Sequence, residues 1–343
     1  MVGTDNDPSL TAAKRDSFEM MQIFAFGPIL IGLGAGAASA LLFASIASGA
    51  VAAIFLFYLS PLPIMIAALG WSHWVGLLAA FTAAISLSPF FGPFFIVAFL
   101  IGIGLPAWWL GYLALLARPA PHDSKILEWY PPGRLVIWAA VIAALTVISA
   151  IPNFGLDEES FRAGLRASFE RVLKMQSPDM PAGFADADAD GLLDLLAALI
   201  PLAAAAVATL TNVFNLWLAG RIVNVSGHLR RPWPDIPEMR FPATVPAMLA
   251  AAIALSFLPS LVGSIAAIVA ASLLMAYALL GFAVLHAVTR QNNARGLILA
   301  GSYIAVVLLF WPLFPMMLIG LADMAFDIRG RFAGKSGPIK PND

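Results

Sequence analysis

The first apolar stretch of the chain reads IFAFGPILIGLGAGAASALLFASIASGA at residues 23–50 and continues to residue 117. The 98 residues between Glu19 and Arg118 include no Lys, Arg, Asp or Glu. A soluble domain needs charged side chains on its surface, whereas a charge at the centre of a bilayer costs about 2.5–3.5 kcal/mol. A helix needs about 20 residues to cross the hydrocarbon core. The stretch therefore predicts several consecutive membrane-spanning helices.

The composition of the whole chain agrees with this interpretation. It is 61% hydrophobic and 11% charged, whereas soluble domains are about 25% charged. The net charge of −1 excludes the basic surface that a nucleic-acid partner requires. The absence of cysteine excludes disulfides, thiolate metal sites and cysteine nucleophiles. No catalytic constellation is found, so we expect neither an enzyme nor a cofactor.

Charge-free blocks set the number of spans. Each block is long enough for one or more helices of about 20 residues. The predicted spans lie near 26–47, 51–69, 72–88, 92–117, 135–156 and 195–220, two more lie within 241–289, and the last lies at 296–322. The fold prediction is an all-α polytopic transmembrane bundle of 8–9 spans. It forms a single domain over residues 20–331, between a cytoplasmic polar tail at 1–19 and a C-terminal polar tail at 332–343.

Lys and Arg in the short loops predict the orientation. Loops 118–134, 221–240 and 290–295 all carry basic residues and are expected in the cytoplasm. Nine spans would place the C-terminal tail outside, yet this tail is also basic. Either the segment 296–322 turns back at its prolines, or the first block holds one more or one fewer span. The sequence leaves both explanations open.

The segment 157–194 is predicted to be extracytoplasmic. Phe161, Leu165, Phe169 and Val172 recur at helical spacing, with charged residues on the other faces. This pattern predicts one amphipathic helix, which either lies on the outer membrane surface or caps the bundle.

An acidic repeat follows this helix. Its spacing matches positions 1, 3, 5 and 9 of a calcium loop of the EF-hand type, with glycine at position 6, but position 12 is Ala197 instead of Glu. The alternative is that these acids stabilise the start of the next helix, where the helix dipole favours negative charge. The candidate ligands of this weak calcium site are Asp186, Asp188, Asp190 and Asp194.

Polar and helix-breaking residues inside the spans are the candidates for substrate binding. Pro61 and Pro63 interrupt a span, and discontinuous helices in transporters free backbone groups to hold a substrate. Asn212 and Asn215 share one face of another span, where they either join helices or line a pocket. His73 is the one titratable side chain between residues 20 and 117 apart from tyrosine, and its tryptophan neighbours also suit the membrane interface.

Two motifs at the ends of spans are candidates for partner docking. The first runs from Glu128 to Arg134 and contains Trp-Tyr-Pro-Pro-Gly. The second runs from Gly320 to Arg329 and contains Asp323 and Asp327. Interfacial Trp, Tyr and Arg also serve as membrane anchors, so anchoring and docking both remain open.

These motifs resemble those of the YybS-like family of predicted bacterial multi-pass membrane proteins, a domain of unknown function numbered 2232. The similarity covers residues 20–331, and its matching pieces are Leu59–Pro63, Arg240–Pro242, Gly281–His286 and Gly320–Arg329. The family is itself distantly similar to the substrate-binding subunits of energy-coupling-factor transporters. That resemblance implies a small-molecule pocket and cytoplasmic ATPase or coupling subunits as partners.

Two functional hypotheses follow for a protein of the bacterial inner membrane whose spans contact the lipid bilayer. In the first, the protein binds or transports a small molecule through the proline break and the asparagine face. In the second, it is a non-transporting scaffold for envelope assembly or morphogenesis that docks envelope-assembly proteins through its cytoplasmic loops.

Overall fold

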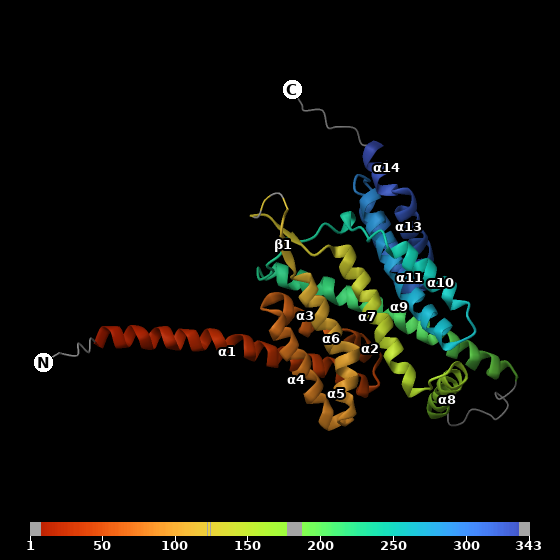
Figure 1. Ribbon diagram of the computed structural model, residues 1–343, viewed down its shortest axis with the longest axis horizontal. Coiled ribbons are helices and arrows are strands. Elements are labelled where there is room, and N and C mark those ends of the chain that lie inside the picture. Colours follow the sequence, from red (N-terminus) through yellow and green to blue (C-terminus); the bar gives the residue numbers. More distant parts are fainter. Residues whose placement is uncertain (1–7, 122, 124, 177–186, 336–343) are drawn as a thin grey trace. The chain divides into compact units, whose positions relative to one another are not determined.

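The computed structural model describes residues 8–121, 123, 125–176 and 187–335. Fourteen α-helices and one two-stranded sheet account for most of these residues (Figure 1), and the predicted all-α architecture is confirmed. The chain divides into two compact units. Unit 1 comprises Met1–Arg118 and Asn215–Pro232, and unit 2 comprises Pro119–Phe214 and Trp233–Asp343.

Unit 1 is a helical bundle built from the N-terminal part of the chain. Glycine permits its closest helix approach, since a Cβ on Gly36 would lie 2.6 Å from the carbonyl oxygen of Ala79. A π-helical turn at Leu100–Gly104 joins the fifth and sixth helices. The helices are α1 (Pro8–Ala44), α2 (Val51–Tyr58), α3 (Pro61–Gly70), α4 (His73–Phe91), α5 (Phe94–Phe99), α6 (Leu105–Ala114) and the C-terminal end of α9 (Ala187–Val225).

Unit 2 holds the other helices and packs around α11. Short strands β1 (Ala117–Pro119) and β2 (Leu127–Trp129) pair in the chain that leads into it. Its helices are α7 (Pro132–Ala150), α8 (Glu158–Gln176), the N-terminal part of α9, α10 (Val245–Ser256), α11 (Leu261–Val288), α12 (Arg295–Leu309), α13 (Leu313–Phe326) and α14 (Ile328–Lys335).

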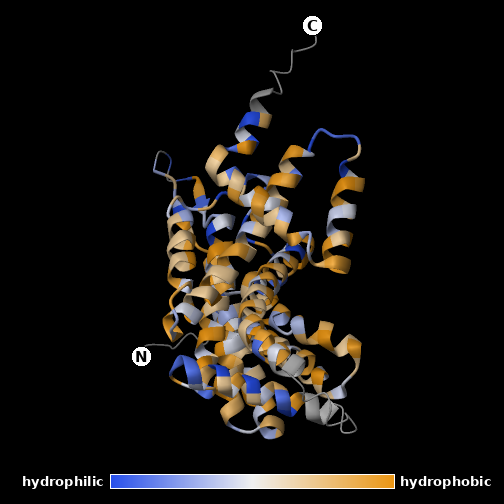
Figure 2. Ribbon diagram, turned by 90° about the vertical axis from the view of Figure 1, so that its right-hand side faces the viewer, coloured by the Kyte–Doolittle hydropathy of each residue, from blue (hydrophilic) through white to orange (hydrophobic). Residues whose placement is uncertain are grey.

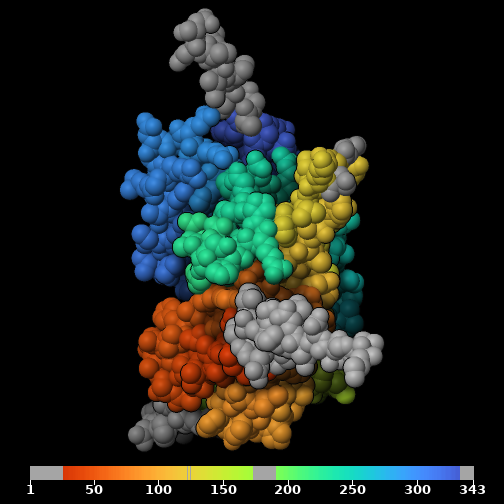
Figure 3. All heavy atoms as spheres, turned by 90° about the vertical axis from the view of Figure 1, so that its left-hand side faces the viewer, coloured from red at the N-terminus to blue at the C-terminus, as the bar shows by residue number. Residues whose placement is uncertain are grey.

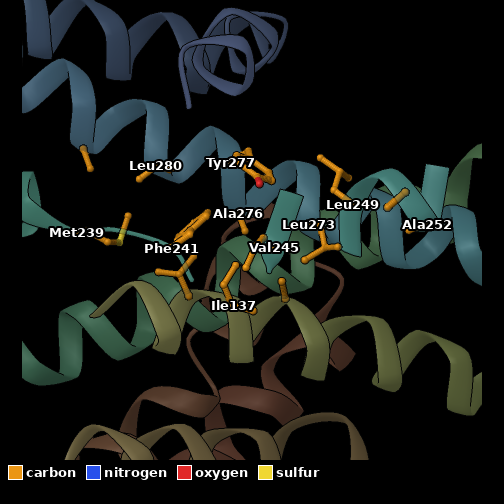
Figure 4. Packing of buried hydrophobic residues seen from close by; sticks show 14 residues of the cluster. Ile137, Met239, Phe241, Val245, Leu249, Ala252, Leu273, Ala276, Tyr277 and Leu280 are labelled. Atoms are coloured by element: carbon orange, nitrogen blue, oxygen red, sulfur yellow. The ribbon is translucent and has the colours of Figure 1, made fainter. Parts of the chain in front are cut away.

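The largest core cluster of unit 2 lies between α7, α10 and α11. Tyr277 and Leu280 of α11 are fully buried there, and the rings of Tyr277 and Phe241 meet edge to face with centroids 5.5 Å apart (Figure 4). One turn after Tyr277 in α11, a Cβ on Gly281 would overlap the carbonyl oxygen of Met316. A Cβ on Gly320 would likewise overlap the carbonyl oxygen of Tyr277. Two glycines therefore allow α11 and α13 to pack backbone against backbone.

The amphipathic helix predicted in segment 157–194 is α8. Phe161 and Leu165 are buried in a second cluster of unit 2, which also contains residues of α7, α9 and α11. At its start, the carboxylate oxygens of Glu158 accept the hydroxyl of Ser264 at 2.9 and 3.0 Å. These contacts show that α8 caps the helices of unit 2, which was one of the two arrangements expected.

Seven helical segments in the described residues are long and apolar enough to cross a membrane. Hydrophobic residues, coloured orange, make up much of the length of the helices (Figure 2). Two segments differ from the nine predicted spans. Block 241–289 holds two helices as predicted, α10 and α11, but α10 has only 12 residues whereas α11 has 28. Segment 296–322 is not one helix but two, α12 and α13.

The chain turns back between α12 and α13. Phe310 has a positive φ of 57°, which ends α12, and Pro312 follows two residues later. Just before α12, Arg290 pairs with Asp235 at 3.3 Å. Just after α13, Arg329 binds the carbonyl oxygen of Pro237. Both ends of the helix pair thus contact the loop before α10, so the explanation in which segment 296–322 turns back is confirmed.

Lengths agree with this hairpin. At about 1.5 Å per residue, the 15 residues of α12 and 14 of α13 extend about 21–23 Å, less than the hydrocarbon thickness of about 30 Å. By the same measure the 28 residues of α11 extend about 42 Å. One end of α11 contacts α8 and the other leads to Arg290. Thus α8 and the loop before α10 lie at opposite ends of α11.

Candidate functional site

The site begins with a buried ion pair after α13. Asp327 is left-handed, with φ of 45°, and turns the chain from α13 into α14. This turn places Arg329 over the last turn of α13, where its Nη2 and Nε donate to one Asp323 carboxylate oxygen at 2.7 and 3.0 Å. Its backbone N–H donates to the other oxygen at 3.1 Å. A buried charge is tolerated only when it is paired and hydrogen-bonded, and here both conditions hold.

The same guanidinium also holds the loop before α10. Nη1 of Arg329 donates to the carbonyl oxygens of Pro237 and Met239 at 2.7 and 2.8 Å. Met239 is buried in the core cluster beside Phe241. One arginine therefore fixes the end of the membrane helices to a loop about 90 residues earlier.

Exposed charges surround this buried centre. Arg240 pairs with Asp327 at 3.3 Å, and both side chains are more than half exposed. Exposed ion pairs of this kind contribute only about 0–1 kcal/mol to the stability of the folded state. Their importance lies in the surface they present rather than in stability.

The first docking motif reaches the same surface. A Cβ on Gly133 would overlap the carbonyl oxygen of Arg240, so glycine permits the start of α7 to lie against the loop. Arg134 beside it is exposed, as is Glu128 on β2. The hydroxyl of Tyr130 accepts the indole N–H of Trp138 at 2.9 Å, which fixes the motif against α7.

We call this surface the platform. It comprises Gly133, Asp235–Arg240, Arg290, Asp327 and Arg329. It brings the two predicted docking motifs together through the loop between them. Asp323 and Arg329 form its internal support, since their polar groups bind each other and the backbone, whereas Arg240, Asp327 and Arg290 are exposed.

The proline break of unit 1 is joined to Asn215. Pro61 and Pro63 lack the N–H groups that continue a helix, and Leu62 N–H turns to Leu59 at 3.0 Å. Nδ2 of Asn215 donates to the carbonyl oxygen of Tyr58 at 2.9 Å. This amide therefore meets the break directly, and its side chain is fully buried.

A residue that the sequence analysis did not select completes the arrangement. The hydroxyl of Ser39 in α1 donates to the carbonyl oxygen of Ser60 at 2.6 Å, inside the break. A serine within an otherwise apolar span was the only sequence signal for it. Polar side chains from α1 and α9 thus satisfy backbone oxygens at the interruption, as membrane helices require.

The remaining substrate candidates lie elsewhere. The ring of His73 lies 4.8 Å from Trp74 and 5.2 Å from Tyr112, measured between centroids, and is partly exposed. Asn212 is buried but belongs to unit 2, because the boundary between units falls after Phe214. The structure thus joins the proline break to Asn215, whereas the ring contacts of His73 are with Trp74 and Tyr112.

The acidic repeat is described only in part. Asp186 lies outside the described residues, and so do the side chains of Asp188 and Asp190. The helix α9 begins at Ala187, inside the acidic repeat. Asp194 pairs with Arg166 of α8 at 3.0 Å. The weak calcium site therefore stays a prediction.

Within unit 1, an arginine of the loop after α9 fixes that loop to α6. Nη1 of Arg231 donates to the carbonyl oxygen of Ala114 at 2.9 Å, at the C-terminal end of α6. Burial lowers the pKa of the Arg231 guanidinium. A cation at this position also interacts favourably with the helix dipole.

These features define a multi-pass α-helical membrane protein with a polar platform at one end of unit 2. The chain belongs to the family described as "Predicted membrane protein (DUF2232)", whose model matches residues 37–324. The match includes Asp323 and ends before Asp327 and Arg329, so it is shorter than the expected range of 20–331. No curated protein and no solved structure matches the chain. The likeness to energy-coupling-factor subunits remains a prediction.

Proposed function

We propose that this protein is a non-transporting scaffold of the bacterial inner membrane, and that its platform docks an envelope-assembly partner. The observation that supports this proposal is the Arg329 centre. It binds Asp323, Pro237 and Met239 at once and so holds the loop in one conformation. A surface ordered before binding loses less conformational entropy when a partner docks.

The platform also has the composition of a docking surface. Its exposed members are Arg240, Asp327, Arg290 and Asp235, so charges of both signs stand side by side. Charged groups at an interface rim set partner choice and association rate more than affinity. The scaffold role needs no catalysis, and we propose that the protein is not an enzyme.

Site-specific photo-crosslinking in intact membranes tests this function. A photoreactive amino acid replaces Arg240 in one variant and Glu159, exposed at the start of α8, in the control. We expect a defined adduct with an envelope-assembly protein from position 240 only. An adduct with an ATPase or coupling subunit would support the transport hypothesis instead. Identical adducts from both positions would contradict docking at the platform.

Small-molecule binding is the second candidate function. A groove of about 400 Å³ between α12 and α13 favours it. The proline break supports it less, because Ser39 and Asn215 already occupy the backbone oxygens there.

A further inference from the structure

The helix α12 is apolar and has little packing of its own. None of its residues is buried, and Leu297, Val307 and Leu308 are each at least 70% exposed. Blue spheres of this C-terminal region lie at the molecular surface in Figure 3. Its best-defined contact with α11 is Tyr303, whose ring stacks on Phe282 at 4.9 Å and whose hydroxyl meets Nε2 of His286 at 2.9 Å.

The groove between α12 and α13 is almost entirely hydrophobic. The turn between the two helices closes one end with Trp311 and Pro312. The hydroxyl of Ser302 points to its own helix, since it donates to the carbonyl oxygen of Ile298 at 2.8 Å. The full lining is Leu297, Ile298, Gly301, Ser302, Ala305, Trp311, Pro312 and Met316.

A basic residue precedes the lining residues of the groove along α12. Arg295 begins α12, three residues before Ile298 and seven before Ser302, so all three share one helix face. Among the described residues Arg295 has no ion-pair partner, whereas Arg290 binds Asp235. From Thr289 to Leu309 the sequence contains two arginines and no acid. An apolar groove with a basic residue at the start of α12 complements a ligand that is apolar at one end and anionic at the other.

We propose that this groove binds one anionic phospholipid, with an acyl chain between α12 and α13 and the phosphate beside Arg295. The inference rests on the second candidate function and names its ligand class. Basic pockets between membrane helices bind anionic headgroups, and each basic residue near the surface is worth roughly a fivefold change in binding. A bound chain would also cover the apolar face that α12 does not bury against the protein.

Native mass spectrometry of the full-length protein tests the proposal. The protein is equilibrated in detergent with equal amounts of phosphatidylglycerol and phosphatidylcholine that carry the same acyl chains. We expect wild type to retain one phosphatidylglycerol preferentially. Arg295→Gln should reduce this preference about fivefold. The matched control Arg230→Gln removes an exposed arginine of another loop and should keep it.

A second pair of variants tests the acyl-chain site. No other atom lies within 4 Å of a Cβ built on Gly301 or Gly296 in α12, so Leu fits at either position. Only Gly301 lines the groove. Gly301→Leu should displace both lipids, and Gly296→Leu should displace neither.

Each result decides one part of the proposal. Equal retention of the two lipids by wild type would overturn the anionic ligand, and an unchanged phosphatidylglycerol preference in Arg295→Gln would overturn the placement of the phosphate beside Arg295. Equal lipid retention by Gly301→Leu and Gly296→Leu would overturn the groove as a binding site altogether. A change of oligomeric state in Gly301→Leu without loss of lipid would assign the groove to a second copy of the chain instead.

Discussion

The side-chain amide of Asn215 donates to the carbonyl oxygen of Tyr58 at 2.9 Å, across 157 positions of the chain. Tyr58 is the last residue of α2. The N–H of Leu62, which would bind the Tyr58 carbonyl in a continuous helix, instead donates to the carbonyl oxygen of Leu59 at the proline break. A buried carbonyl without a donor costs about 1–3 kcal/mol. Asn215 therefore acts first as a structural partner of the proline break.

Replacement of Asn215 by leucine should lower the free energy of unfolding by about 0.6–2 kcal/mol, because the Tyr58 oxygen loses its donor. Unfolding in detergent micelles measures this change. Asn153→Leu is the matched control, since that amide also binds a carbonyl but is exposed and local. If Asn215→Leu unfolds with the same free energy as wild type but loses binding of a small molecule, Asn215 would be a substrate-binding residue rather than a structural one.

Replacement of Arg329 by alanine should lower the free energy of unfolding by about 3–5 kcal/mol, because Asp323 would remain as a buried charge without its partner. Arg240→Ala removes an exposed ion pair and should lower the free energy of unfolding by at most about 1 kcal/mol. The same unfolding assay compares the two variants. Similar small losses for both would show that the Arg329 centre does not support the platform.

The hairpin of α12 and α13 predicts that Asn292 and Arg331 face the same side of the membrane. Because the chain has no cysteine, single cysteines at these exposed positions can be labelled without background. A membrane-impermeant maleimide should label Asn292→Cys and Arg331→Cys under the same conditions in oriented vesicles. Glu159→Cys should label only from the opposite side. Labelling of positions 292 and 331 from different sides would contradict the hairpin.

Acid should loosen the start of α8. Hydrogen bonds from the hydroxyl and backbone N–H of Ser160 lower the pKa of the Asp157 carboxyl below its ordinary value. A depressed pKa in the folded state means that this stabilisation is present at neutral pH and is lost as the pH falls below about 4. The protection of the first-turn amides of α8 against hydrogen exchange, relative to the intrinsic exchange rate at each pH, should therefore fall at acid pH. Asp157→Asn should reduce this pH dependence, and an unchanged dependence would exclude Asp157 as its cause.

Much of the fold follows from composition and spacing alone. Residues 20–117 carry no Lys, Arg, Asp or Glu, which requires membrane helices wherever the chain folds. The 3.6-residue period of Phe161 and Leu165 likewise predicts α8, because one face of that helix must be buried. These predictions depend on local sequence and on the cost of placing charge in lipid, and both can be evaluated without knowing any neighbour.

Tertiary structure decided what each polar residue does. The sequence places Asn215 and Pro61 in separate spans, and only packing shows that the amide meets the break. It places Arg329 near Asp323, but the carbonyls of Pro237 and Met239 become its partners only when the loop folds back. It leaves open whether segment 296–322 crosses or turns back, and the contacts at both ends of the α12–α13 hairpin show that it turns back. The composition of a segment determines whether it lies in lipid or in water. A hydrogen bond between distant residues depends on how the whole chain packs.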